Sequence, residues 1–571
     1  MRIKGKKPNF LIFMVDEERY PVSYETPEIR AWRIAEFKAQ RAFRRHGIEF
    51  HNHYAAATAC SPSRTSIFTG QYPSLHGVSQ TTGAAKGSFD SDVFWLDPNS
   101  VPTMGDYFRA GGYRTFYKGK WHVSHADIIL PGTHDALESY DQNGQPIPEI
   151  IDLYLHANRL DEYGFTGWVG PEPHGAAKAN TGTNRDPGFM TEAIHLIDAL
   201  EAEYKKPSGP KTPWLLVNSF VNPHDIVLFG LAWKNFGYPY TEGFVPDIPR
   251  PQTERENLDT KPRAQKSYVN VYPHMLMPQP TVEEYRQFYY YLQKESDGHI
   301  NNVYERLRNS PFFENTIVIF TSDHGDLLGA HGKMHQKWHQ AYEEATHVPL
   351  IISNPVLFRE PKSAHMLTSH VDLIPTLLGL AEIDAEAAQK ELSKSHNETR
   401  PLAGRDLAPV VLGNQNPDRS TSPLYFMTDD EVSSGQNQFN PVTGKPYHSV
   451  IQPNHVETVI APIKTPDGEK TWKYSRYFDN PQFWSEPFQY DQVEVDCKTI
   501  TKKKPLRSEF EMYNVTEDQL ERENLCRKSN RSRADKAMAE ALAKLLKQQR
   551  KAKRIYPKAL PVYIYDTIQS D

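Results

Sequence analysis

The stretch Tyr54-Ala-Ala-Ala-Thr-Ala-Cys60-Ser-Pro-Ser-Arg64-Thr-Ser-Ile-Phe-Thr-Gly70 places one cysteine among small residues, directly before a helix-start signal. Ser61 is a good N-cap, and Pro62 suits the first helical position because its missing N–H is not needed there. Gly70 is a suitable end for this short helix. The stretch therefore predicts a cysteine at the positive end of a helix, with Arg64 one turn away, where an anion would be attracted.

Two interpretations of Cys60 follow from these residues. A lone cysteine is most often a small buried hydrophobic residue. A cysteine at a helix N-terminus beside an arginine is instead a candidate nucleophile, because both features lower the pKa of a thiol. The stretch leaves both interpretations open, so the rest of the chain must show whether polar residues gather around Cys60.

Other segments predict strands that end in acidic or basic residues. Taken singly, each such residue would more often simply end a strand or lie at the surface. Since ligand sites of open α/β sheets lie at the carboxyl ends of the strands, we expect these residues to meet at one sheet edge. The segments are Phe10–Val15 followed by Asp16 and Glu17, Tyr113–Tyr117 followed by Lys120 and His122, Trp214–Phe220 followed by His224, and Thr316–Phe320 followed by Asp323 and His324.

The spacing Cys60-x-Pro62-x-Arg64, with its continuation to Val78, resembles the signature of the type I sulfatases of the alkaline-phosphatase-like superfamily. The blocks around Lys120, His224 and Asp323 resemble the same family. This resemblance implies an α/β fold, in which helices sandwich a large mixed sheet and a smaller C-terminal α+β subdomain follows. We place the catalytic domain at residues 1–415 and the subdomain at residues 416–571.

The resemblance also implies the chemistry of the site. In this family a formylglycine-generating enzyme oxidises the cysteine, here Cys60, to formylglycine (3-oxoalanine), whose hydrate attacks the sulfur of a sulfate monoester. A thiol lacks the second hydroxyl that would expel the product. The remaining roles carry over as follows: Arg64 orients the nucleophile, Lys120 and Lys337 bind sulfate, His122 is the base that releases sulfate, and His224 donates a proton to the leaving group. Lys333 is the alternative to Lys337, because the spacing to Glu343 departs by about one residue from the usual form.

A divalent cation is implied as well. Its ligands would be Asp16, Glu17, Asp323 and His324, together with the modified Cys60. Oxygen ligands favour Ca²⁺, with Mn²⁺ or Mg²⁺ as alternatives. Glu17 departs from the Asp that the family mostly shows. The histidine-rich tract 331–347 lacks the glutamate of a metalloprotease motif, so zinc is not favoured.

Charge and composition exclude several classes of protein. The net charge of −6 over 571 residues gives no basic patch for nucleic acid. The three cysteines are too few for a disulfide framework. The apolar run Phe10–Val15 is too short for a signal peptide or a membrane span, so we expect a cytoplasmic protein that does not bind membranes. The apolar tail at residues 555–565 predicts a homo-oligomer contact.

Two long segments predict substrate-facing or surface structure. Residues 127–186 are rich in Gly, Pro and Asn and predict loops over the site, and residues 228–280 predict a surface insertion. The expected reaction is arylsulfatase-like hydrolysis of a sulfate ester. Phosphonate monoester or phosphodiester hydrolysis at the same site is the first alternative. A non-catalytic metal- or anion-binding protein with an unmodified Cys60 is the second.

Overall fold

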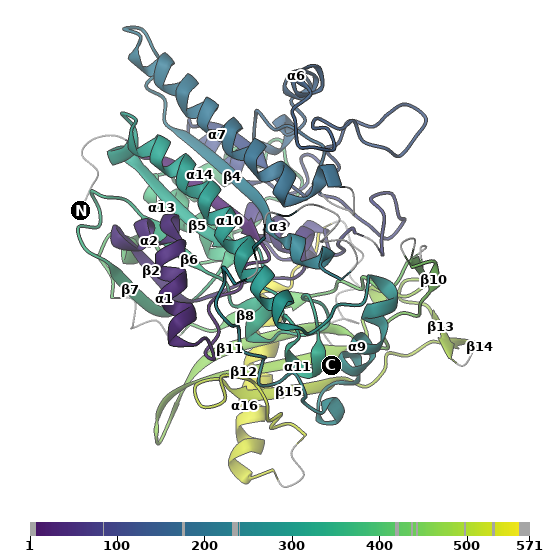
Figure 1. Ribbon diagram of the computed structural model, residues 1–571. Helices are drawn as coiled ribbons and strands as arrows, with labels where there is room; N and C mark the ends of the chain where they lie inside the picture. The colour runs from purple at the N-terminus through teal and green to yellow at the C-terminus, as the bar shows by residue number, and fades with distance from the viewer. Residues whose placement is uncertain are drawn as a thin grey trace.

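The computed structural model describes most of the chain. Within the described residues, a large β-sheet lies between two layers of helices, and a smaller antiparallel sheet follows it (Figure 1). No helix of this part is long and apolar enough to cross a membrane. The described residues are 7–83, 85–173, 178–230, 238, 240–241, 243–416, 422–435, 438–440, 443–495, 498–527 and 531–558.

The large sheet contains seven strands in the order β3-β4-β1-β5-β6-β2-β7. Only β6 runs antiparallel to its two neighbours, and the other pairs are parallel. All four predicted strands are present, so the predicted mixed sheet is confirmed. The strands are β1 (Asn9–Asp16), β2 (Gly47–Tyr54), β3 (Arg114–Gly119), β4 (Trp214–Pro223), β5 (Thr316–Ser322), β6 (Leu350–Ser353) and β7 (Lys362–Ser369).

The two faces of this sheet contact different hydrophobic cores. In β1 the side chains of Phe10, Ile12 and Met14 enter one core, and the alternating Leu11, Phe13 and Val15 enter the other. Such a strand is apolar at every position because both of its faces are covered. The first core includes α3 (Cys60–Thr69), α5 (Met104–Ala110), α13 (Leu373–Leu380) and α14 (Ala385–Leu392), and the second includes α2 (Lys38–Arg45), α7 (Gly182–Lys205) and α10 (Glu283–Arg308).

The register brings several strand ends to one place. Val15 of β1 pairs with Ser322 of β5, and Asp16 pairs with Pro223 of β4. Gly119 of β3 pairs with Ser219 of β4. Because these strands are parallel, the residues that follow them leave the sheet at the same edge. The fold thus brings together the ends predicted to carry the site.

The C-terminal sheet has the order β15-β12-β11-β8 and is antiparallel. Its strands are β8 (Leu424–Thr428), β11 (His455–Thr465), β12 (Gly468–Phe478) and β15 (Glu509–Asn514). The helix of this subdomain, α16 (Arg533–Lys553), begins at a capping box formed by Ser532 and Asp535. This helix packs on the sheet, as Figure 1 shows.

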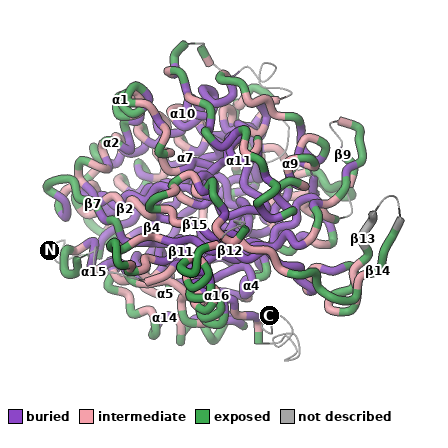
Figure 2. The backbone as a smooth tube through the Cα atoms, turned by 90° about the horizontal axis from the view of Figure 1, so that it is seen from below, coloured by how far each residue is buried: buried purple, intermediate pink, exposed green. Residues whose placement is uncertain are grey.

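The smaller elements lie around these two sheets. Figure 2 shows buried backbone through the interior, with β9 and the β13–β14 hairpin at the edge. The remaining α-helices are α1 (Pro27–Glu36), α4 (Pro73–His76), α6 (Pro148–Ala157), α9 (Arg263–Met275), α11 (Ala330–Lys333), α12 (Glu343–Thr346) and α15 (Ala408–Val411), and the remaining strands are β9 (Phe439–Asn440), β10 (Lys445–Pro446), β13 (Asp491–Val495) and β14 (Lys498–Lys502).

The C-terminal sheet packs directly against the catalytic half of the chain. The Tyr72 hydroxyl donates to the Tyr425 carbonyl at 2.8 Å, and the Thr428 hydroxyl donates to the Thr58 carbonyl at 2.7 Å. The boundary between residues 415 and 416 stays a prediction, since residues 417–421 lie outside the described part. The tail predicted to contact a second subunit also lies largely outside it, beyond residue 558.

Three local predictions are wrong. The helix at the cysteine begins at Cys60 with Ala59 as its N-cap, so Ser61 and Pro62 lie inside its first turn. Residues 127–186 contain α6 and the start of α7 in addition to loops. The predicted surface insertion contains α9, whose Tyr268 and Tyr272 are buried in a hydrophobic core. The sequence did not predict this helix, because its apolar side chains are interspersed with polar ones and give no clear helical period.

Candidate active site

Arg64 joins three strands of the large sheet. Its Nε donates to Asp323 Oδ2 at 2.7 Å and its Nη2 donates to Asp16 Oδ2 at 3.1 Å, and all three side chains are fully buried. Its Nη1 also donates to the Ser219 hydroxyl at 3.0 Å. Charge-assisted bonds of this kind fix both partners. Arg64 therefore holds the ends of β1, β4 and β5 together under the cysteine.

Cys60 lies directly beside this ion-paired group. Its Sγ is 3.2 Å from His324 Nε2 and 3.6 Å from Asp16 Oδ1. The His324 Nδ1 lies 3.0 Å from the Gly325 carbonyl, which can only accept a hydrogen bond, so Nδ1 carries the proton. Burial lowers the pKa of His324 to about 4. The ring is therefore neutral, and the Nε2 lone pair points toward Cys60 and Asp16.

The donor atoms fit a divalent cation. One ligand atom each from Asp16, Cys60, Asp323 and His324 lies within 4.8 Å of every other, and Asp16, Glu17 and His224 form a second such group. Both Glu17 carboxylate oxygens are buried and have no hydrogen-bond partner among the described residues. Burial raises the pKa of Glu17 well above its ordinary value. Buried carboxylate oxygens without hydrogen bonds are free to bind a cation, so the predicted ligand set fits a metal.

Two buried lysines flank the carboxylates. Lys120 Nζ is 2.5 Å from Asp16 Oδ2, and Lys337 Nζ is 3.3 Å from Glu17 Oε2. Burial opposes the charge of Lys337, but Cys60, Glu17 and Asp16 raise its pKa above the ordinary value. Lys333, the alternative, is exposed. The structure therefore brings Lys337 to the site and leaves Lys333 outside it.

His224 follows β4 and reaches the same group. Burial lowers the pKa of His224 well below its ordinary value, and Lys120 adds to that effect. Asp16 acts in the opposite direction. His224 therefore lies beside Asp16 and Glu17, as the strand order predicts.

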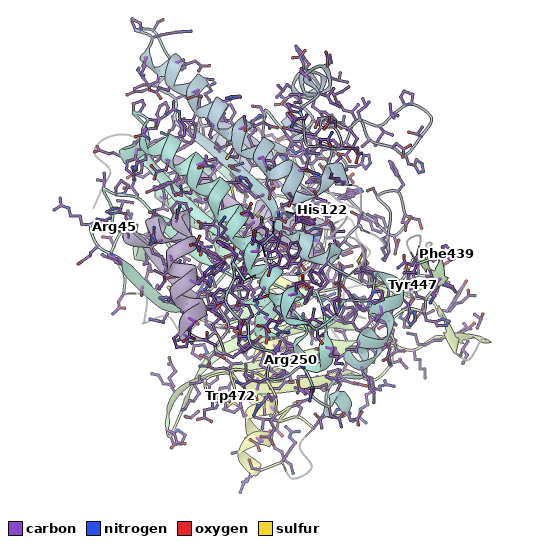
Figure 3. The ribbon with its side chains drawn as sticks, in the orientation of Figure 1. Arg45, His122, Arg250, Phe439, Tyr447 and Trp472 are labelled. Carbon is purple, nitrogen blue, oxygen red and sulfur yellow. The ribbon has the colours of Figure 1, made fainter. Side chains whose placement is uncertain are left out.

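His122 lies near the middle of the view in Figure 3 and is held by residues that sequence reasoning missed. Its Nε2 is 2.8 Å from the Thr82 hydroxyl, and its backbone N–H donates to Glu172 Oε1 at 2.8 Å. Glu172 also accepts from the Trp121 N–H at 3.1 Å, and burial raises its pKa to about 7. A glutamate 50 residues from His122 gives no signal in the sequence.

The prediction that the helix N-terminus and Arg64 lower the pKa of the thiol is wrong. Burial, aided by Asp16, raises the pKa of Cys60 to about 12, and Lys337 and Lys120 only partly offset this. The Arg64 guanidinium is instead ion-paired with Asp16 and Asp323. The protein's own groups thus keep the thiol protonated, and a protonated thiol is a poor nucleophile.

Two cavities lie away from Cys60 and its ion-paired neighbours. One of about 500 Å³ lies over α1 and α2 beside Arg30, Arg33 and Arg41. Another lies at the N-terminal edge of the sheet beside Lys7 and Arg114. Neither is lined by the side chains around Cys60. The candidate site is therefore identified from its residues and not from a cavity.

Comparison with known proteins identifies the family. A family model described as Sulfatase matches residues 8–383, which is more than half of the chain. The chain belongs to the sulfatase family. Sulfatases hydrolyse sulfate esters, and in this sulfatase the buried Cys60 lies beside an Asp and His cluster suited to a metal.

Relatives of this sulfatase differ in what their names say they act on. The "Uncharacterized sulfatase YidJ" of Escherichia coli (strain K12) is 27% identical over 404 residues, covering 66% of this chain and 69% of that protein. A choline-sulfatase of Rhizobium meliloti (strain 1021) is 26% identical over 424 residues, covering 71% and 72%. Family membership therefore leaves the alcohol part of the substrate undecided.

Solved structures share the fold of this sulfatase. A 2-O GAG sulfatase matches with a TM-score of 0.58 at 20% identity, covering 96% of this chain and 93% of that one. The phosphonate monoester hydrolase of Agrobacterium radiobacter matches with a TM-score of 0.56 at 16% identity, covering 96% of each chain. The fold is thus common to enzymes named for two different ester classes.

Proposed function

We propose that this sulfatase hydrolyses sulfate monoesters with a formylglycine made from Cys60 beside a divalent cation. The observation that carries the proposal is the placement of Cys60. Its Sγ lies 3.2 Å from His324 Nε2 and 3.6 Å from Asp16 Oδ1, inside a fully buried ion-paired group. The cations Lys120 and Lys337 lie at the same carboxylates, which supports an anionic ester bound beside this cysteine.

Formylglycine and a divalent cation are the two groups that the chain would acquire, and each would be held at defined residues. Formylglycine at Cys60 would supply the nucleophile and the means of expelling sulfate. A cation held by Asp16, Glu17, Asp323 and His324 would supply positive charge next to the sulfate oxygens. The mainly oxygen donor set favours Ca²⁺, with Mn²⁺ or Mg²⁺ as alternatives.

The side chains of the protein bind and orient the ester. Lys120 and Lys337 are cations fixed by Asp16 and Glu17, so they need no rearrangement to bind an SO₃ group. Fixed charges in a buried site stabilise a charge that develops during reaction. Arg64 orients the residues around Cys60 because it is fully buried and bonded to two carboxylates.

Two histidines are proposed to move protons. His224 is neutral in the free site, because burial and Lys120 lower its pKa. Beside the bound anionic ester it would take up a proton and give it to the leaving oxygen as the S–O bond breaks, which lets an alcohol depart instead of an alkoxide. His122, held by Thr82 and Glu172, would accept a proton when sulfate is released. Both histidines follow strands of the same sheet, which supports these separate roles.

Paired substrates test the proposal. The enzyme, produced together with a formylglycine-generating enzyme and supplied with Ca²⁺, should release sulfate from 4-nitrophenyl sulfate. We expect its kcat/KM on this arylsulfatase substrate to exceed that on phenyl phosphonate esters at least about 100-fold, because the phosphorus of a phosphonate ester carries a carbon substituent in place of one terminal oxygen of the SO₃ group. Higher activity on the phosphonate ester would contradict the sulfatase assignment of this site.

A further inference from the structure

A row of aromatic rings begins at His122 and ends at the surface. The ring of Trp95 lies 5.7 Å from that of His122, between ring centres, and 6.4 Å from that of His125. The ring of Phe89 lies 4.7 Å from that of His125 and stacks on His134 at 4.3 Å. Rings at such separations are in contact. We name Trp95, His125, Phe89 and His134 the aromatic row, which is continuous from His122 outward.

The exposure of the rings increases along the aromatic row. His122 is 2% exposed, whereas Trp95 and His125 are half-buried. Phe89 is 47% exposed, and His134 is also exposed. The row therefore runs from the buried His122 to solvent, and Trp95 is its member next to His122.

Trp95 is held in place by backbone groups. Its indole Nε1 donates to the Ser88 carbonyl at 3.1 Å, so the one polar atom of the ring already has a partner. The N–H of the next residue, Leu96, donates to the Val123 carbonyl at 3.1 Å, which ties this segment to the residue after His122. Because its N–H is used within the protein, Trp95 offers a ligand its apolar faces and edges.

Contact with His122 places Trp95 next to the reacting ester. A base lies within hydrogen-bond distance, about 3 Å, of the group whose proton it accepts, and His122 is the proposed base. The segment of His122 is also bonded to the ion-paired group of the site. Arg64 Nη1 donates to the Lys120 carbonyl at 2.8 Å, and Lys120 Nζ is 2.5 Å from Asp16 Oδ2.

The charges of the site decide which part of the ester meets Trp95. The face of an aromatic ring carries the negative end of its quadrupole, so it does not attract an anionic SO₃ group. Lys120 and Lys337 are the buried cations suited to that group. The alcohol part is uncharged where it joins the ester, and it must reach solvent when it leaves. A half-buried ring beside His122 therefore suits the alcohol part.

We infer that Trp95 is a specificity-determining residue of this site and contacts the alcohol part of the ester. The inference rests on the proposed function and adds a substrate contact to it. A flat unsaturated ring would pack on the indole as the rings of His122 and His125 do, which are tilted by 50° and 68° to it. A puckered saturated ring of the same size lacks this aromatic contact. Trp95 thus favours flat alcohols over saturated ones.

Equilibrium binding to a variant that does not turn over the ester tests this contact. The full chain carrying Cys60→Ala is titrated calorimetrically, with Ca²⁺ present, with phenyl sulfate, cyclohexyl sulfate and inorganic sulfate. We expect phenyl sulfate to bind about fivefold tighter than cyclohexyl sulfate, because aromatic pairs gain affinity beyond their buried area. Adding Trp95→Leu should remove this preference and change the affinity for inorganic sulfate less than about twofold, because the cations of the site are untouched. Adding Trp95→Phe instead should keep the preference, because a ring remains.

Phe94→Leu is the matched control. It removes the neighbouring ring, which is 59% exposed, and should change no affinity. The preference is a ratio of two affinities of the same variant, so a partly unfolded sample does not alter it.

The outcomes that overturn the inference are specific. They are a preference for phenyl sulfate that is absent from the start or unchanged by Trp95→Leu, and an equal weakening of all three ligands. Equal weakening would mean that Trp95 supports the anion site without touching the alcohol. Failure of the proposed function is distinct, because the matured wild-type enzyme would then release sulfate from no ester, whatever its binding preference.

Discussion

The environment of Cys60 explains why this residue would need to be oxidised. Its thiol is buried beside Asp16, and these protein groups alone raise its pKa to about 12. The cationic Lys120 and Lys337 suit an anionic substrate. The small residues around Cys60 suit the oxygen nucleophile that oxidation would supply. The sequence pattern singled out this residue, and the structure places it beside Asp16 and His324. The local rule for the thiol pKa ignored burial.

A pair of lysines of the same loop tests the assignment at residue 337. Lys337→Ala should lower kcat/KM for 4-nitrophenyl sulfate by about 10²–10³, because a buried, preorganised cation is lost. Lys333→Ala removes an exposed lysine and should change it less than twofold. Steady-state kinetics of the two variants measure this. Equal effects, or a larger loss at Lys333, would reverse the assignment.

His224 is best tested by varying the leaving group. His224→Ala should slow hydrolysis of an alkyl sulfate by about 10²–10⁴, because a poor leaving group needs its proton. The loss on 4-nitrophenyl sulfate should be at least tenfold smaller, since nitrophenolate departs without protonation. The measurement is kcat for both esters in the wild type and the variant. A uniform loss would assign His224 a binding role instead of proton donation.

At the scale of elements, the loop of residues 327–342 carries Lys337 and depends on distant partners. Tyr285 of α10 lies 3.1 Å from His335 Nδ1, and the Tyr268 hydroxyl of α9 donates to the His335 carbonyl at 2.7 Å. His331 stacks on Tyr342 at 3.6 Å between ring centres. These contacts come from segments far apart in the sequence, which is why the sequence, although it favoured Lys337, kept Lys333 as the alternative.

The contacts of His331 with Glu256 and Glu344 predict that the stability of the protein depends on pH. Burial opposes protonation, but Glu344 and Glu256 raise the pKa of His331 from 6.5 to about 9. A pKa raised in the folded state gives stability that is present below pH 6.5 and lost as the pH rises to 9, on the order of 3 kcal/mol. The Tm of the wild type should therefore fall across this range. His331→Gln should lower the Tm at pH 6 and flatten the dependence, and an unchanged slope would contradict this.

At the scale of the whole molecule, much of the fold follows from pattern. The apolar runs of β1, β4 and β5 identify buried parallel strands, and parallel strands bring Asp16, His224 and Asp323 to one edge. Glu172 and Thr82 could not be predicted, because each joins the site through a contact with His122, which lies far from it in the chain. The C-terminal sheet was predicted as a unit, but its closeness to the active site was not.

Removal of divalent cations tests whether the strand ends hold a metal. Treatment with a chelator should abolish sulfate release and lower the Tm, because the carboxylates of Asp16, Glu17 and Asp323 would lose their counter-charge. Addition of Ca²⁺ should restore both, and in Asp16→Asn the restoration should be at least tenfold weaker. Full activity in protein shown by elemental analysis to be metal-free would contradict the proposed cation site.

The most direct test of the whole account is the mass of the peptide containing Cys60, taken from enzyme that releases sulfate from 4-nitrophenyl sulfate. We predict a mass about 18 Da below that of the thiol form, as oxidation of cysteine to formylglycine requires, in a fraction that rises in proportion to activity. Active enzyme in which residue 60 keeps the mass of an unmodified cysteine would contradict the account.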